Sequence, residues 1–261
     1  MKINPNKYFG VTTESLKTES FNISLTNHSG NSNIPLHSHD KPYLCLLATG
    51  AYKEESNTVD IITQGEAIYR TANYEHSNSF SGKGGLCLNI ELNDYEHFTT
   101  LNNFRLPNEV SKQRGTVELY KLLYGLKQGL ANDIINIHCY ESMISVISTL
   151  NERGDINWIK KVKELINDNP LDPLSLDKLS LEFSLHPNYI VRKFKEITGF
   201  KLSEYLTKIR LEHSINYLLS NNESITSIAL ESGFYDQSHY CRNFKKHIDT
   251  TPNNFRKVIT G

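Results

Sequence analysis

Long apolar runs, a strong charge bias and an export signal are all missing from this sequence of 261 residues. It has no run of about 18 uncharged apolar residues, so we expect no membrane-spanning helix. The N-terminus MKINPNKYFG contains no apolar signal segment, so we do not expect export. The formal net charge of −1 favours no class of partner until it is divided along the chain.

Cysteines are few and unpaired in the sequence. Cys45, Cys87, Cys139 and Cys241 stand singly, with no CxxC pair and no zinc-finger spacing. This pattern predicts reduced structural thiols in a cytoplasmic protein.

Length and charge distribution indicate two domains, because one domain usually takes about 100 to 200 residues. Residues 156–261 hold 15 Lys and Arg against 12 Asp and Glu, whereas the remainder holds 13 against 17. The C-terminal part is therefore the basic one, with a net charge of +3 against −4.

The region from about Phe21 to Leu92 has the pattern of short β-strands. Apolar or alternating runs (FNISL, YLCLLATG, VDIIT, AIYR, LCLNIEL) are separated by clusters of Gly, Asn, Ser and Asp. The spacing predicts a small antiparallel barrel or sandwich.

Three histidines within this region are candidates for a site. His37 and His39 alternate along a predicted strand and so share a face, and His76 lies in a second segment, GEAIYRTANYEHSNSF. Three histidines are chemically sufficient for Zn, Fe, Mn or Ni with open coordination positions. Alternatively, they line a pocket for a small molecule.

These two segments resemble the double motif of the cupin superfamily. His37, His39 and His76 match its histidines, and Gly50 and Gly65 match two of its glycines. Tyr43 stands where metal-binding members carry glutamate, and Thr71 and Asn73 stand where Pro and Gly are usual. The resemblance implies a jelly-roll fold over residues 1–105, with an effector pocket lined by His37, His39, Tyr43 and His76. We assign no metal and no cofactor.

Helical periodicity begins after the strands, between about Leu106 and Leu150. One apolar face is spaced by Val117, Tyr120, Leu123 and Leu126, and a second by Ile134, Ile137, Tyr140, Ile144 and Ile147. We expect a helical hairpin over residues 106–150 that either forms a dimer interface or packs on the barrel. Residues 151–155, NERGD, read as a linker in which Gly154 ends one helix and Asp155 caps the next.

The stretch Ile225–Arg256 reads as two helices joined by a tight turn. Gly233 permits a left-handed residue at the end of the first helix, and Asp236 can cap the second. Tyr240 and Phe244 are its expected core residues. The outer side of the second helix carries Gln237, Ser238, His239, Cys241, Arg242 and Lys245, whose polar groups suit base edges and phosphates.

An internal repeat duplicates this unit. Residues 189–205 superpose on residues 239–255 at an offset of 50, which matches Arg192 with Arg242 and Phe194 with Phe244. The intervening segment Leu202–Leu219 has no Pro or Gly and would span about 27 Å as a helix. That length suits two helices that must read major-groove faces about 34 Å apart.

The last 100 residues resemble the AraC-type family of transcription regulators. The resemblance is carried by IALESGFYDQSHYCRNFKKHIDTTPNNFR, while Asp249, Ser184 and His186 depart from the usual glycine, glycine, and serine or threonine. It implies two helix-turn-helix units joined by a long linker helix within residues 156–261. By family correspondence Asn188, Val191 and Arg192 face the groove in the first unit, and Gln237, Ser238, Cys241 and Arg242 face it in the second. Lys195, His239, Lys245 and Lys246 are expected to contact the DNA backbone.

Together these observations predict an α+β protein with two domains. It is a DNA-binding transcription regulator, not an enzyme, controlled by an unidentified small effector. The expected partners are double-stranded DNA, a second copy of the chain and, for an activator, RNA polymerase. One alternative is a metal-dependent cupin enzyme fused to a DNA-binding domain. Another keeps DNA binding but makes the N-terminal module a dimerisation element without a ligand.

Overall fold

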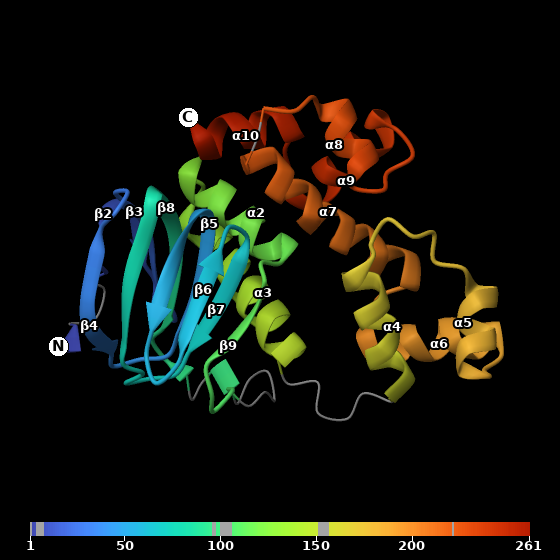
Figure 1. The fold of residues 1–261 in the computed structure, drawn as a ribbon, viewed down its shortest axis with the longest axis horizontal. Helices are drawn as coiled ribbons and strands as arrows, with labels where there is room; N and C mark the ends of the chain where they lie inside the picture. Colours follow the sequence, from blue (N-terminus) through green and yellow to red (C-terminus); the bar gives the residue numbers. More distant parts are fainter. Residues whose placement is uncertain (1, 4–7, 96–97, 100–105, 151–156, 221) are drawn as a thin grey trace. The chain divides into compact units, whose positions relative to one another are not determined.

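The computed structural model describes residues 2–3, 8–95, 98–99, 106–150, 157–220 and 222–261 (Figure 1). The chain forms two compact units. The first comprises residues 1–151 together with 255–261, and the second comprises residues 152–254. The expected linker at 151–155, with Gly154 and Asp155, lies outside the described residues.

The first unit contains the predicted β-sheet, and its main strand pairs are antiparallel. Its strands are β1 (Lys2–Ile3), β2 (Val11–Lys17), β3 (Phe21–His28), β4 (Asn33–His39), β5 (Tyr43–Glu55), β6 (Val59–Thr63), β7 (Glu66–Arg70), β8 (His76–Leu92) and β9 (Ser111–Arg114). The five strands read from the apolar runs are confirmed.

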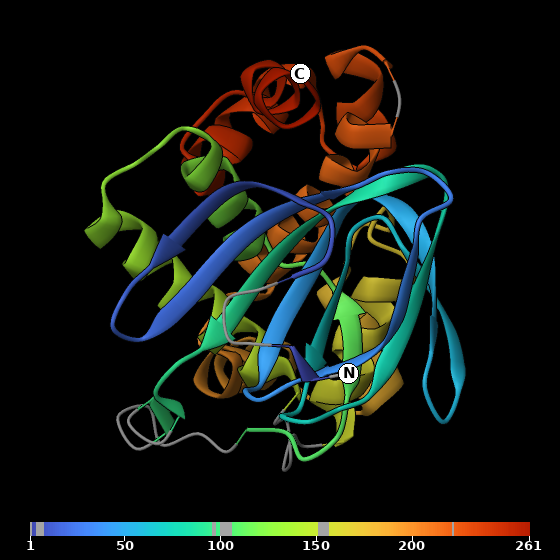
Figure 2. The same ribbon diagram turned by 90° about the vertical axis from the view of Figure 1, so that its left-hand side faces the viewer.

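Two long strands, β5 and β8, organise the sheet. The first half of β5 pairs with β7 and its second half with β6, while β8 pairs with β4 through its first half and with β3 through its second. Irregularities in register interrupt the β5–β8 ladder between Leu47 and Thr49 and between Gly50 and Tyr52. A bulge bends a strand and increases its twist, and Figure 2 shows these long strands bending.

Glycine is required where β5 and β8 meet at this bend. Gly50 has φ +94° and lies opposite Gly85, and a Cβ atom at Gly50 would come within 2.0 Å of the Gly84 carbonyl oxygen. No side chain fits there. The glycine expected to close the first cupin-like motif thus allows two backbones to approach closely.

Two helices, α2 (Val117–Lys127) and α3 (Asn132–Leu150), form the expected hairpin of the first unit. The apolar face predicted for α2 is buried. The prediction of helix for the segment before α2 is wrong, because Ser111–Arg114 forms a strand that pairs with β7. In this segment, pairing with the edge of the sheet outweighs the helical preference read from the local sequence.

The face predicted for α3 is also partly wrong. Ile134 and Ile137 are exposed, whereas Ile135, Cys139 and Met143 are buried. Because α3 contains apolar residues almost all round, the spacing of isoleucines alone did not identify its packed side.

The second unit is helical, as expected. Its helices are α4 (Asn157–Asp168), α5 (Leu176–Phe183), α6 (Pro187–Thr198), α7 (Leu202–Ser220), α8 (Ile225–Glu231) and α9 (Gln237–Ile248), followed by α10 (Pro252–Thr260), which spans the boundary between the units. Helix α7 is continuous between the two repeats. None of the described helices is long and apolar enough to cross a membrane.

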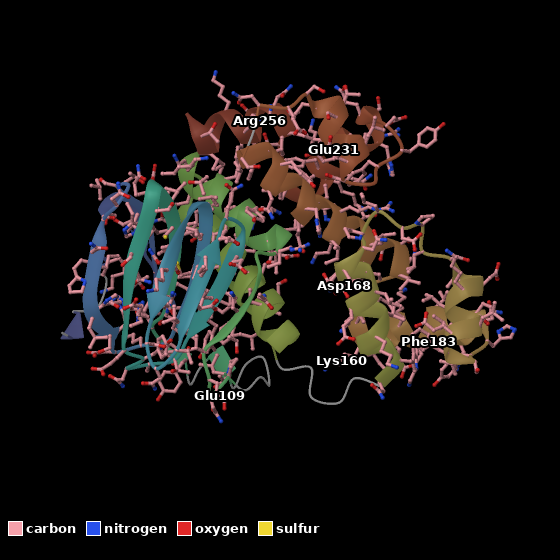
Figure 3. The ribbon with its side chains drawn as sticks, viewed as in Figure 1. Glu109, Lys160, Asp168, Phe183, Glu231 and Arg256 are labelled. Carbon is pink, nitrogen blue, oxygen red and sulfur yellow. The ribbon has the colours of Figure 1, made fainter. Side chains whose placement is uncertain are left out.

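Helices α5 and α6 form what we call the first helix pair, and α8 and α9 form the second. Figure 3 labels Phe183 and Glu231, the residues that end α5 and α8 before the two turns. The turns comprise residues 184–186 and 232–236. The second turn is therefore two residues longer than the first.

Candidate functional sites: a polar cavity and two exposed helix faces

A cavity in the first unit brings together all four residues expected to form an effector pocket. His37, His39, Tyr43 and His76 line it, together with Tyr8, Phe9, Thr26, His28, Ile34, Cys45, Tyr52, Arg70, Asn78, Phe80, Cys87 and Asn89. Its volume is about 40 Å³, which is room for about three or four water molecules at about 10 to 15 Å³ each. As it stands, the cavity suits a very small polar molecule.

The histidines lie against one another because β4 and β8 pair in register. His37 lies directly opposite His76, and their ring centroids are 4.2 Å apart. The Nδ1 atom of His37 is 2.9 Å from the Pro35 carbonyl oxygen, which can only accept, so this nitrogen carries the proton and Nε2 is an acceptor. Likewise, His76 Nδ1 is 3.3 Å from the Tyr74 carbonyl, and its Nε2 accepts from the Tyr43 hydroxyl at 3.1 Å.

Burial keeps these imidazoles neutral. It is the main cause that lowers the pKa of His39 to about 3 and that of His76 to about 2. The positive charge of Arg70 lowers both further. At neutral pH the cavity is therefore lined by uncharged rings that offer hydrogen-bond acceptors.

Arg70 is a buried cation that sequence reasoning missed. Its side chain is 2% exposed, forms an ion pair with Glu54 and donates to the Tyr52 hydroxyl at 2.9 Å. Asn78 donates a further hydrogen bond to Glu54 at 3.1 Å. The sequence offered one indication of this buried cation, which is an arginine at the end of the predicted strand segment AIYR.

Two donors facing this region lack partners among the described residues. They are Nε of Arg70 and the hydroxyl of Tyr8, both inaccessible to solvent. Tyr8 stacks on His39 with ring centroids 4.9 Å apart, and Phe9 meets His37 edge-on at 5.1 Å. Because unsatisfied buried donors are costly, a ligand or water with acceptor atoms would be stabilised here.

The three histidines do not form a metal site in this arrangement. Among the described residues, no group of three or more His, Cys, Asp and Glu side chains is placed to hold a metal ion. Tyr43 occupies the position of the usual carboxylate, and its hydroxyl is engaged with His76.

The first exposed helix face lies on α6. Ile190 and Phe194 are fully buried, which leaves Asn188, Val191, Arg192 and Lys195 exposed. His186 caps the helix, its Nδ1 accepting from the Asn188 amide at 3.2 Å. On the same helix Glu196 pairs with Lys193 at 2.7 Å.

The second exposed helix face lies on α9. Tyr240 and Phe244 are fully buried, and Asp236 caps the helix by accepting from the His239 amide at 2.7 Å. Of the residues predicted from the sequence, Gln237, Ser238, Arg242 and Lys245 are exposed, while His239 and Cys241 are partly exposed. Each helix therefore carries its predicted polar residues on the side opposite its core.

Comparison with known families assigns this part of the chain. A family model described as a helix-turn-helix domain matches residues 179–258. The multiple antibiotic resistance protein MarA of Escherichia coli is 32% identical over 102 residues, which cover 39% of this chain and 80% of MarA.

Other curated relatives match over a smaller part of their length. The bifunctional transcriptional activator/DNA repair enzyme AdaA of Bacillus subtilis is 31% identical over 110 residues, or 42% of this chain and 52% of AdaA. The regulator YijO of Escherichia coli is 25% identical over 120 residues, and 42% of its length is covered. Among solved structures, ToxT from Vibrio cholerae aligns over 93% of this chain and all of its own, with 15% identity and a TM-score of 0.41.

Proposed function

Because this chain belongs to the AraC-type family of transcription regulators, we propose that it recognises specific DNA through both helix pairs and responds to a small effector in its N-terminal cavity. The observation that carries the proposal is the pair of exposed faces on α6 and α9. Each has an exposed arginine two residues before a buried phenylalanine, and arginine matches both guanine and phosphate.

DNA recognition is tested by selecting duplexes from a randomised library with the full chain. We expect a defined motif, and an affinity for it at least about 10³ times that for unrelated DNA. Recovery of fragments without a common motif would refute sequence-specific binding. Lys160, labelled in Figure 3 and exposed on α4, provides the control: Lys160→Ala removes one positive charge and should leave the selected motif unchanged.

The proposed effector is a small polar molecule with at least one strong acceptor group. The free donors of Arg70 and Tyr8 would bind the acceptor, and Nε2 of His37 would take a donor from the ligand. An amide or a vicinal diol offers both groups, whereas a carboxylate supplies the acceptor alone. A ligand larger than a few waters requires Tyr8 and Phe9 to move from the histidine rings.

Thermal unfolding of the full chain against small carboxylic acids, amides and polyols tests the effector proposal. A bound ligand raises the midpoint with concentration, and Tyr8→Phe should weaken that rise by removing one donor. Tyr217→Phe, a change on the partly exposed α7 surface, should not. If no compound shifts the midpoint, the reading without a ligand is favoured instead.

A metal-dependent enzyme is the competing proposal, and metal analysis of the purified protein separates the two. A stoichiometric metal that is lost on His37→Ala would favour the enzyme. The Tyr43 hydroxyl, which donates to His76 where metal-binding members carry glutamate, supports the effector pocket.

We propose that the hairpin of α2 and α3 forms a homodimer interface. Leu130, Ile134 and Ile137 are exposed apolar side chains at its turn and along α3. Sedimentation equilibrium should give a dimer for the native chain and a shift toward monomer for Ile137→Glu. Val59→Glu, a matched change at an exposed apolar residue of β6, should leave the dimer intact.

A further inference from the structure

Two of the four cysteines lie side by side in the wall of the cavity. Cys45 on β5 is in register with Asn89, and Cys87 on β8 is in register with Leu47. The two thiols are thus on one face of adjacent strands, offset by two residues. Both line the cavity and both are buried. Neither is used in the proposed recognition of DNA or effector.

The two thiols are not equivalent, because Cys45 lies on β5, which pairs directly with the strand of Arg70, whereas Cys87 lies on β8, on the far side of β5. The neighbouring Cys87 thiol is the main cause that lowers the pKa of Cys45, and the charge of the Arg70 guanidinium lowers it further, against the opposing effect of burial. The same thiol contact, together with burial, raises the pKa of Cys87. Cys45 is therefore the better nucleophile, and Cys87 remains a protonated thiol beside it.

The size of the cavity selects the reagents that can reach this pair. A volume of about 40 Å³ holds about three or four waters and so admits only molecules of a few non-hydrogen atoms. Hydrogen peroxide is of that size and is a donor and acceptor like water, so the imidazoles and tyrosine hydroxyls can bind it. Alkylating reagents and bulky oxidised thiols do not fit.

We propose that Cys45 and Cys87 form an oxidation site for hydrogen peroxide, closing to a reversible disulfide between β5 and β8. The Cys45 thiolate attacks one peroxide oxygen, the O–O bond breaks, and the departing hydroxide takes up the proton that Cys45 released, which gives a sulfenic acid and water. The Cys87 sulfur then attacks the sulfenic sulfur, and its proton leaves with the hydroxyl as a second water. Two thiols and one peroxide thus give one disulfide and two waters.

Closing this disulfide has a structural consequence. Residues offset by two on adjacent strands usually have Cα atoms about 7 to 8 Å apart, whereas disulfides span about 4.4 to 6.8 Å. The two strands must therefore shift, next to the register irregularity between Leu47 and Thr49. A disulfide formed under strain is also easily reduced, which makes the change reversible.

Peptide mapping of the full chain after peroxide treatment tests the proposal. The reduced protein is titrated with hydrogen peroxide, denatured in N-ethylmaleimide and digested without reductant. We expect the Cys45–Cys87 linked peptide to be the first oxidised product, formed in proportion to peroxide and removed by dithiothreitol. The proposal would be overturned if oxidation began at Cys139 or Cys241. It would also be overturned if Cys139 and Cys241 reacted while Cys45 and Cys87 stayed unlinked.

The other two cysteines supply matched controls. Cys139→Ala removes a buried thiol of the same unit, and Cys241→Ser removes a partly exposed one; both variants should still form the linked peptide. Cys87→Ser should stop at a sulfenic acid on Cys45, which dimedone traps when the peroxide-treated protein is denatured in its presence, with at least a tenfold gain in labelling over the native chain. Cys87→Ala gives the same readout if the serine variant does not fold, and the absence of dimedone labelling in a folded variant contradicts the assigned order of attack.

Discussion

The two helix pairs are copies of one unit, yet they differ in how completely they are packed. In α8 the residues Ile225, Ile228 and Ala229 are buried, and Phe234 of the following turn is buried with them. In α5 only Leu179 is buried among the residues of the helix, and Phe183 and the turn residue Leu185 are partly exposed. The same arrangement of helices is thus held by a closed core in the second pair and by a more open one in the first.

The pairs also differ in where they place glycine. Four positions adopt left-handed backbone conformations: Ser184 and Gly199 in the first pair, and Gly233 and Asp249 in the second. Glycine adopts this conformation freely, whereas a side chain there costs about 1 to 2 kcal/mol, less for Asp and Asn. Backbone strain is therefore larger at Ser184, in the turn of the first pair, than at Asp249, which ends α9 in the second pair.

The exposed faces differ in charge as well. On α6 the Lys193 amine is paired with Glu196, whereas α9 has no acidic residue and ends with Lys245, Lys246 and His247. The second pair is therefore expected to supply more of the attraction to phosphate, and the first more of the contact with base edges and methyl groups.

Truncation of the core phenylalanines gives the largest expected effect. Phe194→Ala and Phe244→Ala should each cost about 3 to 5 kcal/mol of unfolding free energy. The cost should be larger at Phe244, because its closed surroundings can collapse less readily around the cavity. Urea unfolding of the full chain, followed by circular dichroism, measures both.

The control for this prediction is Phe200→Ala. Phe200 is 39% exposed and should cost well under about 1 kcal/mol. An equal or larger loss at Phe194 than at Phe244 would show that the difference in burial does not govern the stability of the pairs.

This difference between the pairs could be predicted from the sequence only in part. The repeat offset located both units, and the departures at Ser184, His186 and Asp249 were visible. The structural consequence of these departures was not visible. A sequence does not show that Ser184 adopts the left-handed conformation in place of glycine, or that the His186 ring caps the helix in place of a hydroxyl. Local chemistry indicates a turn, but its backbone angles are set by the packing of both helices.

The cavity was predictable to a similar extent. Alternation placed His37 and His39 on one face, and motif spacing added His76 and Tyr43. Arg70, Glu54 and Tyr52 were missed because their contacts join β5 to β7, and strand register depends on bulges that the sequence pattern does not reveal. The burial of α3 was misread for a related reason: a helix that is apolar on several sides can pack in more than one rotation.

Replacement of the equivalent arginines of the two helix pairs gives the next largest expected effect. Arg192→Ala and Arg242→Ala should each weaken binding to the selected DNA by about 1 to 3 kcal/mol and relax the preference at one base position. Under the proposal that each pair reads its own part of the DNA site, the two variants should lose preference at different base positions. Fluorescence anisotropy on a library of single-base changes measures this.

If both variants lose the same position, or if either retains full specificity, the assignment of one reading helix to each pair is wrong. Arg210 is the matched control, because its Nε donates to the Pro170 carbonyl at 2.7 Å and so serves the fold. Arg210→Ala should change the free energy of unfolding without altering base preference.

Glycine at the two strained positions should stabilise the chain unequally. Ser184→Gly is expected to raise the free energy of unfolding by about 1 kcal/mol, since relief of the left-handed conformation exceeds the added entropy of the unfolded chain. Asp249→Gly should gain only a few tenths of a kcal/mol, because aspartate tolerates this conformation. Thermal unfolding by calorimetry resolves the larger change.

The opposite substitution sharpens the test. Gly233→Ala places a Cβ atom 2.8 Å from Nε of Arg210 at φ +81°, so it should destabilise by more than Gly199→Ala, where the space around the glycine is open. Equal losses would mean that backbone conformation alone, and not crowding, sets the requirement for glycine.

The smallest expected effect concerns the salt dependence of binding. Each lysine that contacts a phosphate contributes about 0.9 to the slope of log affinity against log salt concentration. Lys245→Gln combined with Lys246→Gln should therefore flatten the slope by about 1.8, and Lys195→Gln by about 0.9 at most. Lys160→Gln on α4 should leave it unchanged. A larger change from Lys195 than from the two lysines of α9 would reverse the assignment, making the loosely packed first pair the main anchor on the DNA backbone and the closed second pair the reader of bases.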